Sequence, residues 1–181
     1  TQGAFSVDAA AQLQGKRSMM QQEKTAPTNE SPVVLEFSAG FRSQFGELLP
    51  VYLQMKDALI SGDVEQIRAF AKAALAQLEQ LPKKDLQNIE VEHITKSLEY
   101  LGQIAQNQTL ENQRAAFVWL NEYFIPIAKN TMVSGFDLYV QKCPMANNNN
   151  GAVWLSASQE IRNPYYGDAM LACGSVIDTI K

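Results

Sequence analysis

The clearest pattern in the sequence is a helical repeat of apolar residues between residues 41 and 127. The first series advances in steps of four and three, which puts its members on one face of a helix of about five turns. Three further series with the helical period follow it. The four series are Phe41, Phe45, Leu48, Tyr52, Met55 and Leu59; Val64, Ile67, Phe70 or Ala71, Ala74, Leu78 and Leu81; Leu86, Ile89, Ile94, Leu98, Leu101 and Ala105; and Leu110, Phe117, Leu120, Phe124 and Ile127.

Polar and helix-breaking residues separate the four series. A Ser-Gly pair ends the first helix, and Asp63 with Gln66 has the spacing of a capping box that starts the second. Pro82 ends the second helix, and Thr109 is the expected N-cap of the fourth. Because the connections are short, consecutive helices should be antiparallel neighbours. The pattern predicts an all-α fold, an up-down four-helix bundle over residues 41–131.

The two ends of the chain do not have the helical pattern of residues 41–127. Residues 15–32 are polar, lack a period and contain two prolines, which is typical of a linker. We therefore expect residues 1–37 to lie outside the folded domain and residues 38–181 to form it. After about residue 133, alternating residues and the turn signal Asn147–Gly151 predict an irregular C-terminal hairpin or cap on the bundle.

Composition excludes several classes of function. The 181 residues carry 15 Lys and Arg against 19 Asp and Glu, a net charge of -4, which argues against a nucleic-acid partner. No apolar run is long enough to predict a membrane span. A hydrolytic triad or a histidine-rich zinc site would have only His93 to use. There is no Cys-x-x-Cys motif for a thiol oxidoreductase, so we expect a protein that is not an enzyme.

The chemical signal lies in two sulfur pairs near the C-terminus. Cys143 and Met145 share a face if their segment is extended, and Met170 and Cys173 share one on a helical turn. Two thiolates and two thioethers form a soft donor set, which selects Cu(I) or Ag(I). The same residues also fit a structural Cys143–Cys173 disulfide with the methionines as core filler. Spacing leaves both interpretations open.

A longer signature surrounds these residues. Residues 139–174 contain Cys-Pro-Met, Gly-Ala-x-Trp-Leu-Ser, Glu-Ile-x-Asn-Pro-Tyr and Met-Leu-x-Cys-Gly. Together they resemble a helical domain found at the C-terminal end of CusB-type periplasmic adaptors, the membrane fusion proteins of copper and silver efflux pumps. Residues 3–13 are similar to the closing strand of the membrane-proximal β-domain of these adaptors. On this resemblance, the chain begins at the end of the adaptor body and continues through a linker into the helical domain.

The resemblance implies a periplasmic Cu(I)- or Ag(I)-binding module of an RND-type heavy-metal efflux adaptor, which captures or senses metal for export in metal resistance. Cys143, Met145, Met170 and Cys173 stand at the motif positions and are the candidate ligands. His93 is a further candidate, because similar domains often carry a histidine in that part of the bundle. The metal would not be required for folding.

The implied partners are the inner-membrane pump and the other adaptor domains, with a periplasmic metallochaperone as a further candidate. The module would be tethered to the inner membrane through parts of the adaptor outside this chain. The alternative is a structural or protein-interaction domain that is closed by a Cys143–Cys173 disulfide and has no metal role.

Overall fold

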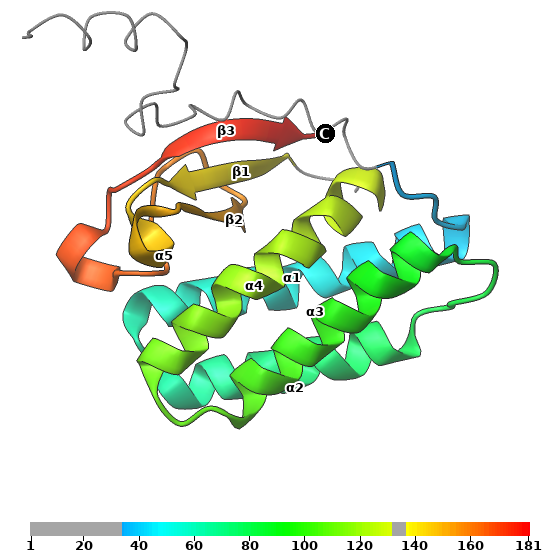
Figure 1. Cartoon of the computed structure of the whole chain (residues 1–181), viewed down its shortest axis with the longest axis horizontal. Helices are drawn as coiled ribbons and strands as arrows, with labels where there is room; N and C mark the ends of the chain where they lie inside the picture. Colours follow the sequence, from blue (N-terminus) through cyan, green and yellow to red (C-terminus); the bar gives the residue numbers. More distant parts are fainter. Residues whose placement is uncertain (1–33, 132–136) are drawn as a thin grey trace, which may run out of the picture. The chain divides into compact units, whose positions relative to one another are not determined.

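The computed structural model describes residues 34–131 and 137–181, which form four long helices and a small antiparallel sheet (Figure 1). None of the described helices is long and apolar enough to cross a membrane. The predicted linker and the strand-like N-terminal segment lie outside the described residues. The elements are α1 (Ala39–Ser61), α2 (Val64–Gln80), α3 (Asn88–Gln106), α4 (Leu110–Thr131), β1 (Leu138–Cys143), α5 (Ala146–Asn149), β2 (Ala152–Ser156), the 3-10 turn η1 (Gly167–Met170) and β3 (Ser175–Ile180).

The four predicted helices are present, and local capping explains their ends. The hydroxyl of Ser38 accepts a hydrogen bond from the backbone N–H of Phe41 at the start of α1. Gly62 ends α1 in the left-handed region, at a φ of 74°, which glycine adopts at little cost. Asp63 then caps α2 by accepting from the backbone N–H of Gln66 at 3.0 Å.

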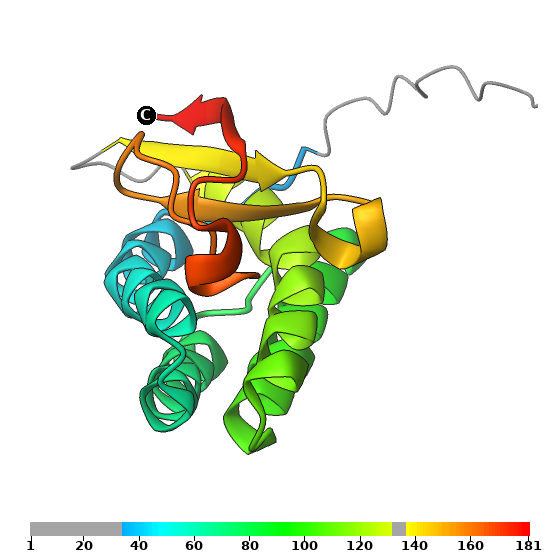
Figure 2. The same ribbon diagram turned by 90° about the vertical axis from the view of Figure 1, so that its left-hand side faces the viewer.

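Consecutive helices pack against each other, and the sheet covers the side of the bundle between α1 and α4 (Figure 2). Strand β2 packs on α4, and η1 packs on α1. The prediction of an all-α fold was therefore wrong, because the expected cap is a three-stranded sheet. The sequence signal was weak because β3 is an edge strand with five of its six residues exposed, so it lacks the apolar alternation of a half-buried strand.

The register of the sheet places the two cysteines. The strand order is β2-β1-β3, with both neighbours antiparallel to β1. The predicted hairpin turn joins β1 to β2, and Asn147, Asn148 and Asn149 all adopt positive φ there. Pairing of Lys142 with Ser175 starts β3 directly opposite the end of β1. The residues just before β3 therefore lie beside the last residue of β1.

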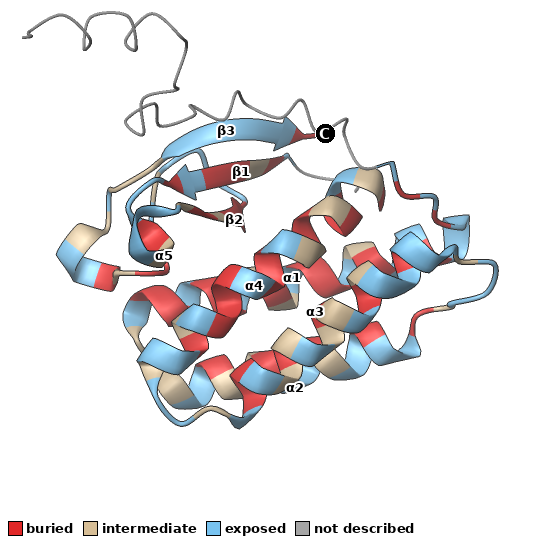
Figure 3. Cartoon of the chain, viewed as in Figure 1, coloured by how far each residue is buried: buried red, intermediate tan, exposed pale blue. Residues whose placement is uncertain are grey.

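The core matches most of the predicted apolar faces (Figure 3). Not every residue of the four helical series is buried, because Leu98 is half-buried and Ile89 is 41% exposed. Leu35 and Phe37 also pack in the core, so the folded domain begins before residue 38, earlier than predicted. The members of these series that are fully buried include Phe45, Tyr52, Leu78, Phe117 and Leu120.

A buried hydrogen-bond network fixes the sheet on the helices. The hydroxyl of Tyr52 donates to Asn121 Oδ1 at 2.6 Å and accepts from the backbone N–H of Leu155 at 3.1 Å. Asn121 Nδ2 in turn donates to the hydroxyl of Tyr165 at 3.0 Å, which donates to the carbonyl of Val153. Helices α1 and α4 thereby hold strand β2 and the segment that follows it in one position.

Candidate functional site

The candidate site is a pair of thiols at one end of the sheet. The sulfurs of Cys143 and Cys173 lie 3.0 Å apart, and the structure contains both cysteines as free thiols. Cys143 ends β1 and is fully buried, whereas Cys173 lies just before β3 and is half-buried. A reactant from solvent therefore reaches the pair through Cys173.

Asn163 holds the loop that carries Cys173. Its buried side-chain amide donates to the carbonyl of Cys173 at 3.1 Å, and its backbone N–H donates to the carbonyl of Leu171 at 2.8 Å. Its Oδ1 accepts from the backbone N–H of Tyr165 at 2.8 Å. The Asn-Pro-Tyr motif thus links the Cys173 loop to the buried network, a role that the sequence analysis did not assign.

The residue after Cys173 has to be glycine for the thiols to meet. Gly174 has a φ of 142°, and a Cβ there would lie 2.8 Å from the carbonyl oxygen of Lys142 and 3.0 Å from the indole of Trp154. Side chains larger than hydrogen would therefore push the loop away from β1 and Trp154. The final glycine of the Met-Leu-x-Cys-Gly motif is the sequence feature that indicates this close approach.

The two methionines are placed differently from each other, and the position of Met145 departs from the expectation. Strand β1 ends at Cys143, and Met145 has helical backbone angles, so the expected shared face of Cys143 and Met145 does not form. Met145 is 45% exposed. Met170 is half-buried and accepts a hydrogen bond from the backbone N–H of Cys173 through its carbonyl. Met145 lies two residues after Cys143 and Met170 three residues before Cys173, and the two thiols contact each other.

His93 lies elsewhere in the molecule. It is on α3, which packs against α2 and α4, and its ring meets Tyr123 edge-on. Its Nδ1 lies 2.8 Å from the carbonyl oxygen of Ile89, so it is the nitrogen that donates and Nε2 is left as the possible ligand atom. The structure does not bring His93 to the thiols. Within residues 34–131 and 137–181, no three His, Cys, Asp or Glu side chains gather as a metal site.

The surroundings of Cys173 favour its protonated thiol over the thiolate. The hydrogen bond with Cys143 raises the pKa of the Cys173 thiol above its ordinary value, and burial adds to the effect. Lys142 does not offset this rise in the pKa of Cys173. It precedes Cys143 on β1, and neighbouring residues of a strand face opposite sides. The Lys142 side chain lies over Gly151. Binding of a soft metal by both sulfurs would displace the protons of the two thiols.

Comparison with known proteins concerns the helices. Residues 48–135 match a family described as a protein of unknown function (DUF3347). The match starts within α1, covers α2 to α4 and ends before β1, so neither cysteine lies in it. No curated protein and no solved structure matches the chain. The match therefore concerns the helical part of the chain and says nothing about the thiol pair.

Proposed function

We propose that this chain is a periplasmic Cu(I)- or Ag(I)-binding module of a heavy-metal efflux adaptor, with Cys143 and Cys173 as the principal ligands. The observation that carries the proposal is the 3.0 Å contact between the two thiols. Two sulfur donors select soft monovalent metals over hard cations. The resemblance of residues 139–174 to the adaptor domain supplies the context of copper and silver export.

The geometry of the pair is compatible with a metal between the sulfurs. With metal–sulfur bonds of about 2.3 Å, two sulfurs on one metal lie roughly 3.7 to 4.6 Å apart, from tetrahedral to linear. The thiols would therefore separate by about 1 Å on binding, beyond their present contact. The loop that carries the half-buried Cys173 is the part of the site that can move to make room for a metal, whereas Cys143 is held in the central strand of the sheet.

The methionines suit exchange of metal with partners. Met145 is exposed beside the buried Cys143, so its thioether is available to a metal that arrives from solvent. Met170 sits one hydrogen-bonded turn before Cys173. A site with one buried thiolate, one half-buried thiolate and an exposed neutral donor would bind the ion tightly and still pass it to a pump or metallochaperone, the partners that the resemblance implies.

The same contact favours a second candidate function. Two thiols this close can be oxidised to a disulfide that ties the Cys173 loop to β1, which would make the chain a structural or protein-interaction domain. The disulfide and the metal compete for the same sulfurs, because a disulfide cannot bind Cu(I).

The test is an anaerobic Cu(I) titration of fully reduced protein against a competing chelator. We expect one ion per chain, with two titratable thiols in the metal-free protein and none accessible in the loaded protein. The double change Cys143→Ser and Cys173→Ser should abolish binding and leave the helical circular dichroism unchanged. Met145→Leu should weaken binding, whereas Met55→Leu, a buried core position on α1, is the matched control and should not.

Two outcomes would overturn the proposal. Stoichiometric binding by the double serine variant would place the metal elsewhere in the chain. Failure of the reduced wild-type protein to bind Cu(I), together with an absence of free thiols in the protein as purified, would favour the disulfide-closed interaction domain. His93→Ala should leave the affinity unchanged, because its ring lies on α3 against Tyr123.

A further inference from the structure

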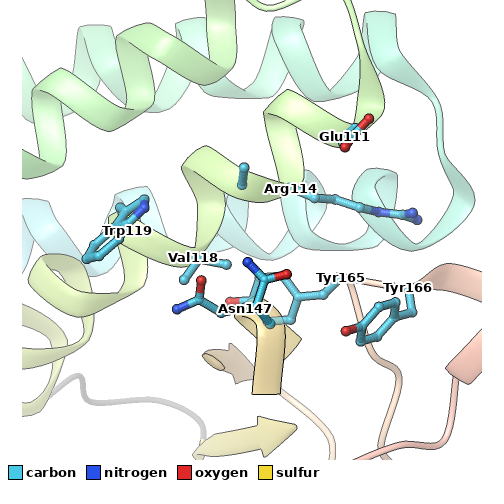
Figure 4. Close-up of a pocket in the computed structure, with 9 residues that line it drawn as sticks. Glu111, Arg114, Val118, Trp119, Asn147, Tyr165 and Tyr166 are labelled. Atoms are coloured by element: carbon cyan, nitrogen blue, oxygen red, sulfur yellow. The ribbon is translucent and has the colours of Figure 1, made fainter. Parts of the chain in front are cut away.

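The two thiols of the candidate site differ in how a reagent from solvent reaches them. Cys143 is fully buried, whereas Cys173 is half-buried in a loop whose residues Ala172 and Ser175 are exposed. A cleft of about 270 Å³ lies between α4 and the turn that follows β1 (Figure 4), but neither cysteine is among its lining residues. This cleft does not expose the buried sulfur, so Cys173 is the sulfur that an external reagent meets.

The chain on either side of Cys173 carries short side chains. Its immediate neighbours are Ala172 and Gly174, and Ser175 follows. A Cβ at Gly174 would lie 2.8 Å from the carbonyl oxygen of Lys142, so the backbone there has no room for a larger residue. The immediate neighbours therefore place no bulky group between Cys173 and an approaching sulfur.

Cys143 is placed to react with Cys173 rather than with an external reagent. It is the last residue of β1, the central strand of the sheet, where it pairs with Ala152 of β2. Its sulfur lies 3.0 Å from that of Cys173. Once Cys173 has formed a bond to an external sulfur, Cys143 is already beside the atom that it must attack.

The loop that carries Cys173 allows the small movement that a disulfide needs. A disulfide bond is about 2.05 Å long, so the two sulfurs must approach by about 1 Å. The Asn163 side-chain amide donates to the carbonyl of Cys173 at 3.1 Å, and the backbone N–H of Cys173 donates to the carbonyl of Met170 at 3.0 Å. Both bonds hold the backbone and leave the Cys173 side chain to turn between its rotamers. The pair can therefore close without a movement of β1.

We propose that the thiol pair is a reversible dithiol–disulfide switch with a fixed order of reaction. Cys173 exchanges first with the disulfide of a small thiol or of a redox protein, and Cys143 then resolves the mixed disulfide. The oxidised pair has no thiolate to offer a metal, so reduction is the step that makes the site able to bind Cu(I) or Ag(I). This control of metal binding rests on the proposed function, whereas the order of exchange does not.

The exchange balances without a further reactant. The Cys173 thiolate attacks one sulfur of the external disulfide R–S–S–R, whose S–S bond breaks, and the first thiolate leaves and takes up the proton that Cys173 released. The Cys143 thiolate then attacks the Cys173 sulfur, and the second external thiolate leaves and takes up the proton of Cys143. The two protein thiols lose two electrons, and the external disulfide is reduced to two thiols. An excess of reduced thiol reverses both steps.

The test uses metal-free, reduced full-length chain, glutathione disulfide as the probe and mass spectrometry of the intact protein. Wild type should lose both thiol hydrogens and retain no glutathione. Cys143→Ser should retain one glutathione on Cys173, because the resolving thiol is missing. Cys173→Ser should react more than about tenfold more slowly than Cys143→Ser, since a fully buried thiol reacts only after local opening.

Two controls separate access from intrinsic reactivity and from misfolding. In urea, where burial is lost, the two single variants should take up glutathione at the same rate. Cys143→Ala, which leaves no hydroxyl in the buried position, should retain the adduct as Cys143→Ser does. Circular dichroism of each variant checks that the helices are intact.

A second oxidant distinguishes the two sources of the external disulfide. Oxidised protein disulfide isomerase replaces glutathione disulfide at equal concentration, and Cys143→Ser should again trap the mixed disulfide through Cys173. If the protein oxidant reacts faster, a redox protein is the natural partner of the switch. If glutathione disulfide reacts faster, a small thiol is the natural partner.

The proposal fails if folded Cys173→Ser reacts as fast as Cys143→Ser, or if wild type keeps the glutathione adduct. It also fails if excess reduced glutathione does not restore both thiols. None of these measurements uses metal, so the exchange stands even if the Cu(I) titration overturns the proposed function. Equal Cu(I) affinity of the oxidised and the reduced wild type would overturn the control of metal binding.

Discussion

Asn163 donates a hydrogen bond of 3.1 Å from its side chain to the carbonyl oxygen of Cys173, ten residues further along the chain. The bond crosses the loop that contains η1 and ends at one of the two candidate metal ligands. Because Asn163 is fully buried, water does not compete for this bond. The position of the Cys173 thiol is therefore set by a residue that does not touch the sulfur.

Replacing Asn163 with alanine should loosen the Cys173 loop. The change removes two side-chain hydrogen bonds and leaves the backbone N–H of Tyr165 without its acceptor, which should lower the free energy of unfolding by about 1–3 kcal/mol. Alkylation of Cys173 should become faster in the folded protein. Gln159→Ala, at an exposed residue of the same region, is the control for both measurements. An unchanged alkylation rate in Asn163→Ala would show that the loop is held by other contacts.

Two glycine substitutions should have opposite effects. Gly174→Ala places a Cβ against Lys142 and Trp154 at a positive φ, so it should destabilise the fold by about 1–3 kcal/mol and slow oxidation of the thiol pair. Gly102→Ala lies within α3 with open space around it and should stabilise the protein by about 0.4–1 kcal/mol. Urea denaturation measures both. Equal effects at the two positions would contradict the close approach at Gly174.

Replacing Phe117 should lower the stability of the fold more than replacing most other residues. Its ring is fully buried between Tyr52 and Tyr165, with centroid distances of 5.6 and 5.8 Å. Phe117→Ala should lower the free energy of unfolding by about 3–5 kcal/mol. Trp119→Ala, two residues along the same helix but exposed, should change it by less than about 0.5 kcal/mol. A loss near zero for Phe117→Ala would mean that the inner face of α4 is misplaced.

The buried phenols should make the protein sensitive to alkali. Burial raises the pKa of Tyr52 and of Tyr165 above the ordinary value of about 10, so the unfolded chain loses these protons at lower pH than the folded one. Stability from this source is complete below about pH 10 and is lost as pH rises above it. Each phenol should contribute a slope of about 1.4 kcal/mol per pH unit there.

Tyr52→Phe isolates one of these two phenols. The variant should lose about half of the alkaline slope in urea denaturation followed between about pH 8 and pH 11. Near neutral pH it should be less stable than the wild type by about 1–3 kcal/mol, because Leu155 loses an acceptor and Asn121 loses a donor. A variant with the full wild-type slope would show that Tyr52 does not contribute to the alkaline transition.

The sequence by itself determined the four helices, since their signals are local. The residues of one helical face recur every three or four positions, and the caps at Asp63 and Gly62 act within one turn. Apolar periodicity also predicted most of the core correctly. It failed at Leu98 and Ile89 because the exposure of a residue at the edge of a face depends on which neighbour covers it.

Only the tertiary structure decided the sheet and the positions of the sulfur residues. Strand β3 is stabilised by pairing with β1, more than thirty residues earlier, and its exposed residues carry little periodicity of their own. The sequence located both sulfur pairs near one turn-connected segment. The pairing of Lys142 with Ser175 brings the two thiols together, and the turn after Cys143 leaves Met145 in solvent. Long-range register and loop direction arise from contacts between distant residues, which local periodicity does not specify.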